Sequence, residues 1–465
     1  MPREVPVLLR FQVTNHASLR DEQELSLIAN DDRPGRAECD VPSSEFRTVP
    51  VAAVYGPNAS GKSNALDALM WMRFAVLSSF RRWDPAGGVP RRPFALRTDP
   101  AQFPSTYEMD FVAEGTRYEF GFTVDDERII EEWLFCFPEG RRRRLYVREG
   151  SDSESMTFGR SLVGRPKTIA RLLRPNSLYL SVAAAQGHDL LGTLHRWFRN
   201  GVRVASDQDF ADRLDYTMEL YRRRETRGSR GEALTRLLRF ADLGVADLRV
   251  QDQDEEVKEE HGRVVAALRE ALGRRVHVAG VPRHRVQVEH RTDEGLFGLE
   301  IDEESSGTRT WISMLGPVLS ALGEGSVLCV DELDARLHPY LADALVGLFQ
   351  NANSNRHGAQ LIFSTHETSL LGHTSRTELF RDQVWFTEKD AGTSATRLFP
   401  ITDFYVRDSV TKDNLEKRYL SGRYGALPFL DDDLLSQLTA ELSDGGERGS
   451  GKVAETSSGA SPGAA

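Results

Sequence analysis

The strongest constraint on this chain is the segment Gly56–Ser63, which reads Gly-Pro-Asn-Ala-Ser-Gly-Lys-Ser. All its fixed positions match the phosphate-loop pattern G-x-x-x-x-G-K-[ST]. The apolar run Val51–Tyr55 precedes it, and apolar residues at helical spacing follow from Lys62. A loop between a strand and a helix turns its backbone N–H groups and the helix dipole toward an anion. We therefore expect an α/β core that binds a nucleotide polyphosphate.

The residues of this loop have different expected roles. Lys62 is expected to reach the β and γ phosphates, and the Ser63 hydroxyl to hold Mg²⁺. Glycines allow the backbone to curl around the phosphates. The expected nucleotide contacts are Gly56, Pro57, Asn58, Ala59, Ser60, Gly61, Lys62, Ser63 and Asn64.

Two later segments complete a nucleotide site. Ser326–Glu332 is an apolar strand that ends in two carboxylates. Asp331 is expected to orient the magnesium shell, and Glu332 to act as the base for an attacking water. About thirty residues later, another apolar strand ends at His366, which is expected to contact the γ-phosphate. The order of these segments after a phosphate loop indicates a nucleotide hydrolase.

The bulk properties exclude several classes of protein. A net charge of -11 over 465 residues argues against wholesale coating of nucleic acid. The three cysteines form no ligand pair, and no apolar run reaches the roughly 18 residues of a membrane span. The N-terminus lacks a signal-peptide core, so the expected location is the cytoplasm.

The pattern along the chain predicts the remaining elements. Hairpins are expected at 8–28 and 286–301, an antiparallel sheet over 107–148, a strand at Ser177–Val182 and mostly helices over 190–272. Strands alternate with helices from Val327 to Ser364, which predicts a parallel sheet. The expected divisions are 1–185, an N-terminal lobe with the phosphate loop; 186–285, a helical insert; 286–445, a C-terminal lobe; and 446–465, a disordered tail.

Together these motifs resemble those of ATP-binding cassette ATPases, and within them the branch that includes RecF, SMC-type heads and RloA or AbiL-type ATPases. The RloA-like resemblance extends from Phe11 to Pro428. It implies a head with a mixed parallel core sheet, an antiparallel β-subdomain and a helical insert. It also implies a signature motif at Ser305, Ser306, Gly307 and Thr308, a D-loop at Asp334, a switch histidine at His366 and a Q-loop in which Gln186 helps hold Mg²⁺.

The signature departs from the usual Leu-Ser-Gly-Gly-Gln, since Ser306 replaces the first glycine and Thr308 the glutamine. In proteins of this kind the signature of one subunit contacts the γ-phosphate held by the other. The resemblance therefore implies two ATP molecules sandwiched in a head-to-tail homodimer, with higher oligomers left open. Without the resemblance, the Ser305 segment is simply an N-cap and Gln186 a surface glutamine.

Two functional hypotheses remain open. By resemblance, the chain is the ATP-driven sensor of an anti-phage, abortive-infection-like system that acts with a separate Toprim or RloB-like nuclease, because the sequence contains no nuclease constellation of its own. The alternative is a RecF-like clamp in DNA repair. Arg141–Arg144 and Arg222–Arg224 are candidates for DNA contact, although solvated surface charge is the simpler interpretation of both.

Overall fold

The computed structural model describes residues 6–30, 36–42, 44–205, 209–223, 229–241, 244–272, 282–372, 375–404, 415–428 and 433–439. Residues 1–427 form one compact unit and residues 428–465 a second. The expected boundaries at 185/186 and 285/286 therefore fall inside the first unit. The expected disordered tail, 446–465, lies outside the described residues.

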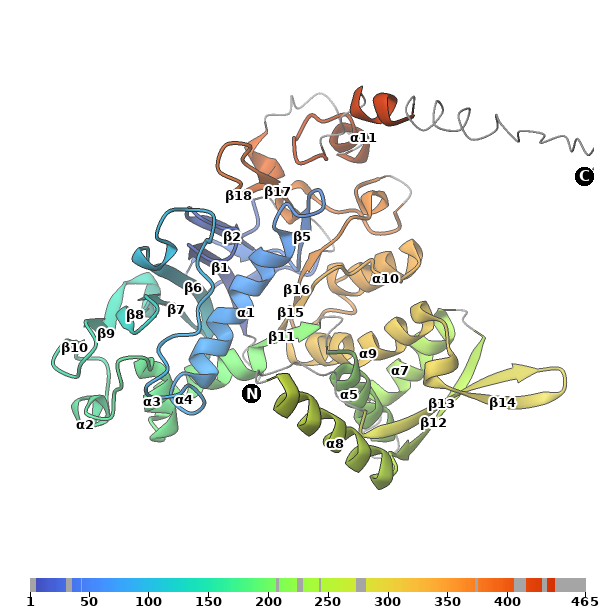
Figure 1. Cartoon of the computed structure of the whole chain (residues 1–465), viewed down its shortest axis with the longest axis horizontal. Helices are drawn as coiled ribbons and strands as arrows, with labels where there is room; N and C mark the ends of the chain where they lie inside the picture. The colour runs from blue at the N-terminus through green and yellow to red at the C-terminus, as the bar shows by residue number, and fades with distance from the viewer. Residues whose placement is uncertain are drawn as a thin grey trace, which may run out of the picture. The chain divides into compact units, whose positions relative to one another are not determined.

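A six-stranded sheet forms the centre of the first unit (Figure 1). Its order is β11-β15-β16-β5-β17-β18, and all neighbours are parallel except β17 and β18. The strands are β5 (Val51–Tyr55), β11 (Val202–Ala205), β15 (Val327–Val330), β16 (Gln360–Ser364), β17 (Val384–Lys389) and β18 (Thr396–Pro400). Every residue of β5, β15 and β16 is buried, as continuous apolar strands of a doubly covered sheet should be.

The two faces of this sheet pack into different cores. Successive side chains of a strand point to opposite faces. Ala52 and Val54 join one cluster with the helix α1 (Lys62–Ser78) and the antiparallel strands. Val51, Ala53 and Tyr55 join the other with α5 (Phe210–Arg222), α9 (Ser306–Glu324) and α10 (Pro339–Gln350).

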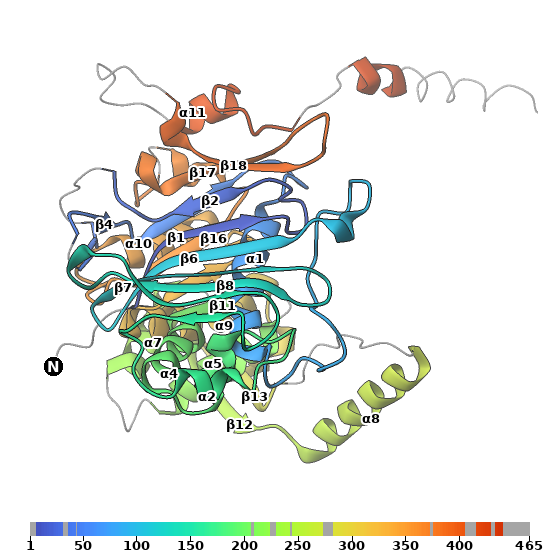
Figure 2. The same cartoon turned by 90° about the vertical axis from the view of Figure 1, so that its left-hand side faces the viewer.

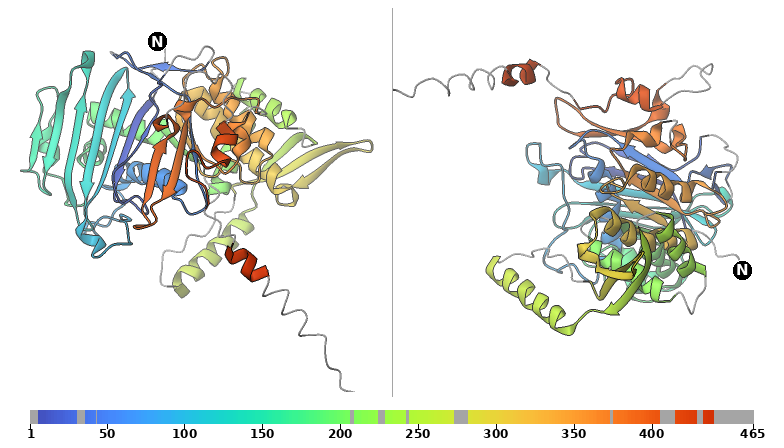
Figure 3. Two further views of the ribbon diagram at one scale, coloured as in Figure 1. Left: turned by 90° about the horizontal axis from the view of Figure 1, so that it is seen from above. Right: turned by 90° about the vertical axis from the view of Figure 1, so that its right-hand side faces the viewer.

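A seven-stranded antiparallel sheet, β10-β9-β8-β7-β6-β1-β2, packs on the α1 side (Figure 2). Its long strands run beside one another in Figure 3, left. They are β1 (Val7–Thr14), β2 (Gln23–Ser26), β6 (Ser105–Ala113), β7 (Thr116–Val124), β8 (Ile129–Cys136), β9 (Arg143–Glu149) and β10 (Met156–Phe158). The predicted hairpin and antiparallel sheet are both confirmed.

The remaining elements surround these two sheets. A small sheet, β12-β13-β14, contains the second predicted hairpin. Its strands and the other helices are β12 (Val245–Asp252), β13 (His284–Thr292), β14 (Gly295–Glu300), α2 (Pro166–Ala170), α3 (Tyr179–Ala185), α4 (Asp189–Arg196), α7 (Ser229–Phe240), α8 (Glu255–Leu272) and α11 (Leu415–Leu420), with a short β3–β4 pair (Cys39–Asp40, Arg47–Thr48). The mixed α/β architecture with parallel and antiparallel sheets is as expected.

One local prediction is wrong. Residues 177–182 are not a strand, because α3 begins at Tyr179. A short, fully buried apolar run is compatible with a strand or a helix. The buried Glu132 carboxylate decides between them by accepting the amides of Tyr179 and Leu180 at the start of the helix. The stretch 190–272 is mostly helical, as predicted, and it also supplies β11 to the central sheet and β12 to the small one.

Among the described residues, none of the helices combines the length and hydrophobicity needed to cross a membrane.

Candidate nucleotide site

The phosphate loop follows the buried strand β5 and ends at the N-terminus of α1. Gly56 (φ 152°) and Gly61 (φ 107°) adopt backbone conformations that L side chains rarely take, and Ala59 is also left-handed (φ 62°). Gly61 is the residue before the 17-residue helix. The loop therefore has the curled backbone, and the helix end behind it, that anion binding requires.

Neighbouring strands hold this loop in place. A Cβ on Gly61 would lie 2.2 Å from Thr396 Oγ1 and 2.7 Å from Ser18 Oγ. Thr396 donates to the Ser60 carbonyl (2.7 Å), and the Ser60 hydroxyl pairs with Thr387 (2.6 Å). Thr387 and Thr396 carry no motif of their own, so only the tertiary structure reveals their role in fixing the loop.

Lys62 lies along the inside of the loop. Its Nζ donates to the carbonyls of Gly56 (2.8 Å) and Pro57 (3.2 Å), and lies 3.5 Å from His366 Nδ1. Burial lowers the pKa of Lys62, while Glu332, Asp331 and Asp334 oppose that shift. The structure thus brings the predicted lysine and the predicted strand-end histidine together.

The two carboxylates after β15 lie opposite this loop. Ser63 Oγ donates to Asp331 Oδ1 at 3.1 Å, and Ser364 Oγ donates to the same oxygen at 2.6 Å. Ser364 Oγ also accepts the amide of Glu332 at 2.7 Å. Ser364, at the end of β16, thus positions the Asp331 carboxylate and the Glu332 backbone, a role that sequence analysis missed.

The oxygens of Ser63 and Asp331 fit a hard divalent cation such as Mg²⁺, which is commonly held by few protein ligands together with phosphate oxygens. Among the described residues no group of three or more His, Cys, Asp or Glu side chains could hold a metal by itself. A magnesium ion here would therefore depend on nucleotide oxygens for the rest of its shell.

A cavity of about 390 Å³ opens beside these groups. Ser63, Asp331 and Glu332 line it. Glu332 is exposed to it and has a left-handed backbone (φ 53°), a conformation that costs a non-glycine residue energy. Backbone strain of this kind is typical of functional positions.

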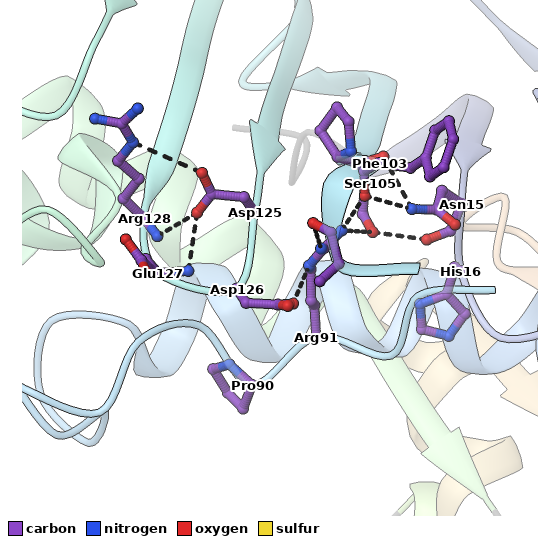
Figure 4. A network of polar contacts seen from close by, with 12 residues as sticks. Asn15, His16, Pro90, Arg91, Phe103, Ser105, Asp125, Asp126, Glu127 and Arg128 are labelled. Atoms are coloured by element: carbon purple, nitrogen blue, oxygen red, sulfur yellow. Dashed lines mark hydrogen bonds and ion pairs between the residues drawn. The ribbon is translucent and has the colours of Figure 1, made fainter. Parts of the chain in front are cut away.

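Arg92 also lines this cavity and pairs with Asp67 at 2.5 Å. Its neighbour Arg91 anchors the loop: it pairs with Asp126 (2.6 Å) and donates to the Phe103 carbonyl and the Ser105 hydroxyl (Figure 4). Arg92 and its partner Asp67 thereby lie together in the wall of this cavity. In the sequence, Arg92 is marked only by its place in a Pro, Gly and Arg-rich stretch over 85–93.

The residues expected to form the D-loop and the signature do not line this cavity. Both Asp334 carboxylate oxygens lie 3.3 Å from the backbone amide of His366. Ser305 caps α9 by accepting the amide of Thr308 (3.1 Å), and a Cβ on Gly307 would lie 2.8 Å from the Arg336 carbonyl. Ser305 and Ser306 are exposed, and neither lines the cavity beside Ser63.

The structure does not bring Gln186 to this site, which corrects the expected Q-loop. Gln186 follows α3 and lines a different cavity with Arg165 and His188. The residues just before it line a cavity with Leu77 and Arg81, at the C-terminal end of α1. That end lies about 25 Å along the helix from Lys62, at 1.5 Å per residue. Helix α3 therefore places Gln186 near the C-terminal end of α1, away from the phosphate loop.

The arginine clusters weighed for DNA contact are partly paired. Arg142 donates to Glu119 (2.6 Å), Arg222 to Asp252 (2.6 Å), and Arg223 bonds Glu219 (2.5 Å). Arg224 lies outside the described residues. The pairings favour solvated surface charge at both clusters.

Residues 51–372 match a protein family described as "AAA domain, putative AbiEii toxin, Type IV TA system". The match spans more than two thirds of the chain and includes the phosphate loop, both carboxylates and His366. The chain belongs to this AAA family. A comparison of the AAA protein with curated proteins finds no match.

Several solved structures are distantly similar to this AAA protein. An Smc head bound to the C-winged helix domain of ScpA has 12% identity and a TM-score of 0.39, covering 84% of this chain and 97% of its own. The SMC head domain from Thermotoga maritima has 13% identity and a TM-score of 0.37, covering 86% and 99%. An Smc head with an extended coiled coil, bound to the C-terminal domain of ScpA derived from Pyrococcus furiosus, has 12% and 0.35, covering 85% and 96%. At these TM-scores the likeness is general, not detailed.

Proposed function

We propose that this AAA protein binds and hydrolyses ATP, and that hydrolysis requires two copies facing each other. The observation that carries this proposal is the meeting of Ser63, Asp331 and Glu332 around one cavity, with Lys62 and His366 in contact beside it. These residues come from distant parts of the chain and lie at the ends of adjacent parallel strands, where α/β proteins bind ligands.

Each residue has a distinct task in the proposed reaction. The loop amides and Lys62 bind and orient the β and γ phosphates, and Arg92 adds positive charge across the cavity. Glu332 accepts a proton from the attacking water. Ser63 and Asp331 would hold Mg²⁺, which neutralises charge on the phosphate oxygens when bound.

The dimer requirement rests on the position of the signature segment. Ser305 and Ser306 are exposed at the N-terminus of a 19-residue helix, whose dipole suits an anion, yet they do not line their own chain's cavity. In a head-to-tail dimer with two-fold symmetry, each such helix end would face the γ-phosphate bound by the other copy.

For the biological role we propose the regulatory ATPase of an anti-phage system with a separate nuclease effector. The family description, which names a toxin of a type IV toxin–antitoxin system, supports a role of this kind over a RecF-like repair clamp. The identity of the neighbouring gene tests the choice: a nuclease gene next to this one supports defence, whereas replication or repair genes contradict it.

The ATPase assignment is tested by Glu332→Gln. This variant should bind ATP as the wild type does, hydrolyse it at least about 100-fold more slowly, and elute as a dimer with ATP and magnesium, because binding is kept while the base is lost. Glu259→Gln, on the exposed face of α8, is the matched control. Wild-type hydrolysis by Glu332→Gln would refute the role of the base.

The shared site is tested by mixing two inactive variants, Lys62→Ala and Ser306→Arg. Mixed dimers contain one site with a normal loop and a normal signature, so an equal mixture should recover about a quarter of the wild-type activity. Each variant alone should stay inactive. If Ser306→Arg is active alone, or the mixture stays inactive, the two-copy site is refuted.

A further inference from the structure

A second cavity lies at the opposite end of α1 from the phosphate loop. It has a volume of about 200 Å³ and is bordered by α3, α4 and the turn that follows α4. Helices α3 and α4 lie beside the lower end of α1 in Figure 1. Its polar lining consists of Arg81, Ser181, His195, Arg196 and Arg199. We call it the arginine cavity. None of these residues belongs to the nucleotide site described above.

The three arginines of this cavity lack acidic partners. Within the described part of the chain Arg81, Arg196 and Arg199 form no ion pair, and Arg196 donates only to the Thr193 hydroxyl (2.7 Å). By contrast, Arg91, Arg142 and many other arginines pair with carboxylates. Three cations that converge without a counter-charge produce a strongly positive local potential.

A buried imidazole lies among these arginines. His195 is only 8% exposed, lines the cavity, and has no hydrogen-bond partner among the described residues. Burial lowers the pKa of His195 to about 4, and Arg199, Arg81 and Arg196 contribute to the shift. The imidazole of His195 thus borders the cavity without a protein partner, and a polar ligand can reach it there.

The hydroxyl of Ser181 adds a further group. It is buried and accepts the amide of Phe80 at 3.2 Å, which leaves its own proton to donate. Guanidinium groups bind phosphate oxygens through paired, charge-assisted hydrogen bonds. The cavity is therefore lined by several hydrogen-bond donors, and its lining contains no carboxylate that would compete with an anion for them.

The surrounding sequence extends this positive region. Residues 155–206 contain eight Lys and Arg against a single acidic residue, Asp189, although acidic residues outnumber basic ones in the whole chain. Arg165, Lys167 and Arg171 are exposed on or next to α2, which packs against α3. Asp189 lies at the opposite end of α4 from Arg196.

We propose that the arginine cavity is a second phosphate-binding site of this protein, separate from the phosphate loop. It takes the phosphate group of either a free anion or a nucleic-acid backbone, and the flanking cations favour the backbone. The proposal does not depend on ATP hydrolysis at the first site.

The test uses the full chain and the double variant Arg81→Gln/Arg199→Gln. Both side chains are exposed, so the variant should fold like the wild type. Arg263→Gln/Arg291→Gln, at exposed positions of α8 and β13, is the matched control with the same loss of charge. The first arm measures the anisotropy of a labelled single-stranded oligonucleotide of about 20 nucleotides over a series of salt concentrations.

We expect the cavity variant to bind this oligonucleotide roughly tenfold more weakly than the wild type, with a salt dependence reduced by about one to two ions released. The control variant should bind nearly as the wild type does. The second arm measures the rise in Tm on adding inorganic phosphate to each protein in the Lys62→Ala background, where the phosphate loop is weakened.

Oligonucleotide binding that depends on Arg81 and Arg199 supports a backbone ligand. A phosphate-dependent rise in Tm that only the cavity variant loses, without oligonucleotide binding, supports a free anion. If neither probe binds, or if the control variant loses as much binding as the cavity variant, the proposal is refuted.

Discussion

The two ends of α1 present different kinds of group to a phosphate. At the N-terminal end, backbone amides, two glycines and Lys62 form a loop that nearby strands hold by hydrogen bonds. At the C-terminal end, side chains from three separate elements converge on the arginine cavity. The phosphate loop consists of eight consecutive residues. The arginine cavity forms only when α1, α3 and α4 pack together.

The two arrangements also differ in rigidity. The loop leaves no space beside Gly61, whereas the arginines of the cavity are exposed and free of ion pairs with described residues. A rigid loop of amides can select the geometry of a polyphosphate, because its donors are fixed in advance. Exposed arginine side chains can change rotamer to follow a ligand, while each guanidinium keeps its paired geometry toward a phosphate.

The largest expected difference between the two ends is in their response to loss of one lysine. Lys62→Ala should weaken ATP binding by about 100-fold or more, because it removes the one side-chain cation within the loop. Oligonucleotide binding should not change. Titration of both ligands into the same protein measures the effect, with Lys258→Ala, on the exposed helix α8, as the control. A parallel loss of both activities would show that the two ends are one site.

A smaller effect is expected from adding one methyl group. Gly61→Ala requires a left-handed backbone and places a Cβ 2.2 Å from Thr396 Oγ1, so ATP binding should fall about tenfold and Tm by several degrees. Gly187→Ala, after α3, has a similar backbone requirement (φ 74°) but open space around the Cβ. It should cost about 1 kcal/mol and leave ATP binding intact. Equal effects of the two changes on ATP binding would contradict the crowding at the loop.

The smallest expected effect is a difference in acid stability. Folding lowers the pKa of His195 from 6.5 to about 4, so between these values the unfolded chain binds a proton that the folded chain does not. Stability therefore falls as pH falls from 6.5 toward 4, by roughly 1–3 kcal/mol from this residue. His195→Gln should lose correspondingly less in urea unfolding at the two pH values. The exposed His357→Gln is the control. If both variants behave alike, folding does not lower the pKa of His195.

Local patterns predicted much of this fold because they reflect local constraints. The alternating strands from Tyr107 to Arg148 and the helix from Lys62 were predicted correctly, since side-chain periodicity directly follows burial. Strand β11 was missed. It has four residues and its place in the sheet depends on pairing with β15, which is distant in sequence.

The site residues also fall into two groups, those that local motifs predicted and those that only the structure revealed. Lys62, Asp331, Glu332 and His366 were predicted from motifs, and the structure brings them together. Arg92, Ser364 and Thr396 were not, because each acts through a contact with a segment far along the chain. Gln186 was predicted to lie at the nucleotide site after a strand. Residues 179–185 instead form a helix, and this helix lies at the other end of α1.

The sequence by itself determined the phosphate loop, the two strand-end carboxylates and the kind of sheet that carries them, because each depends on residues that are neighbours in the chain. The tertiary structure decided which side chains meet across long separations: Ser63 with Asp331, Arg92 with the cavity, and Arg81 with Arg199. Spacing along the chain does not encode these meetings, because they follow from how buried surfaces pack together.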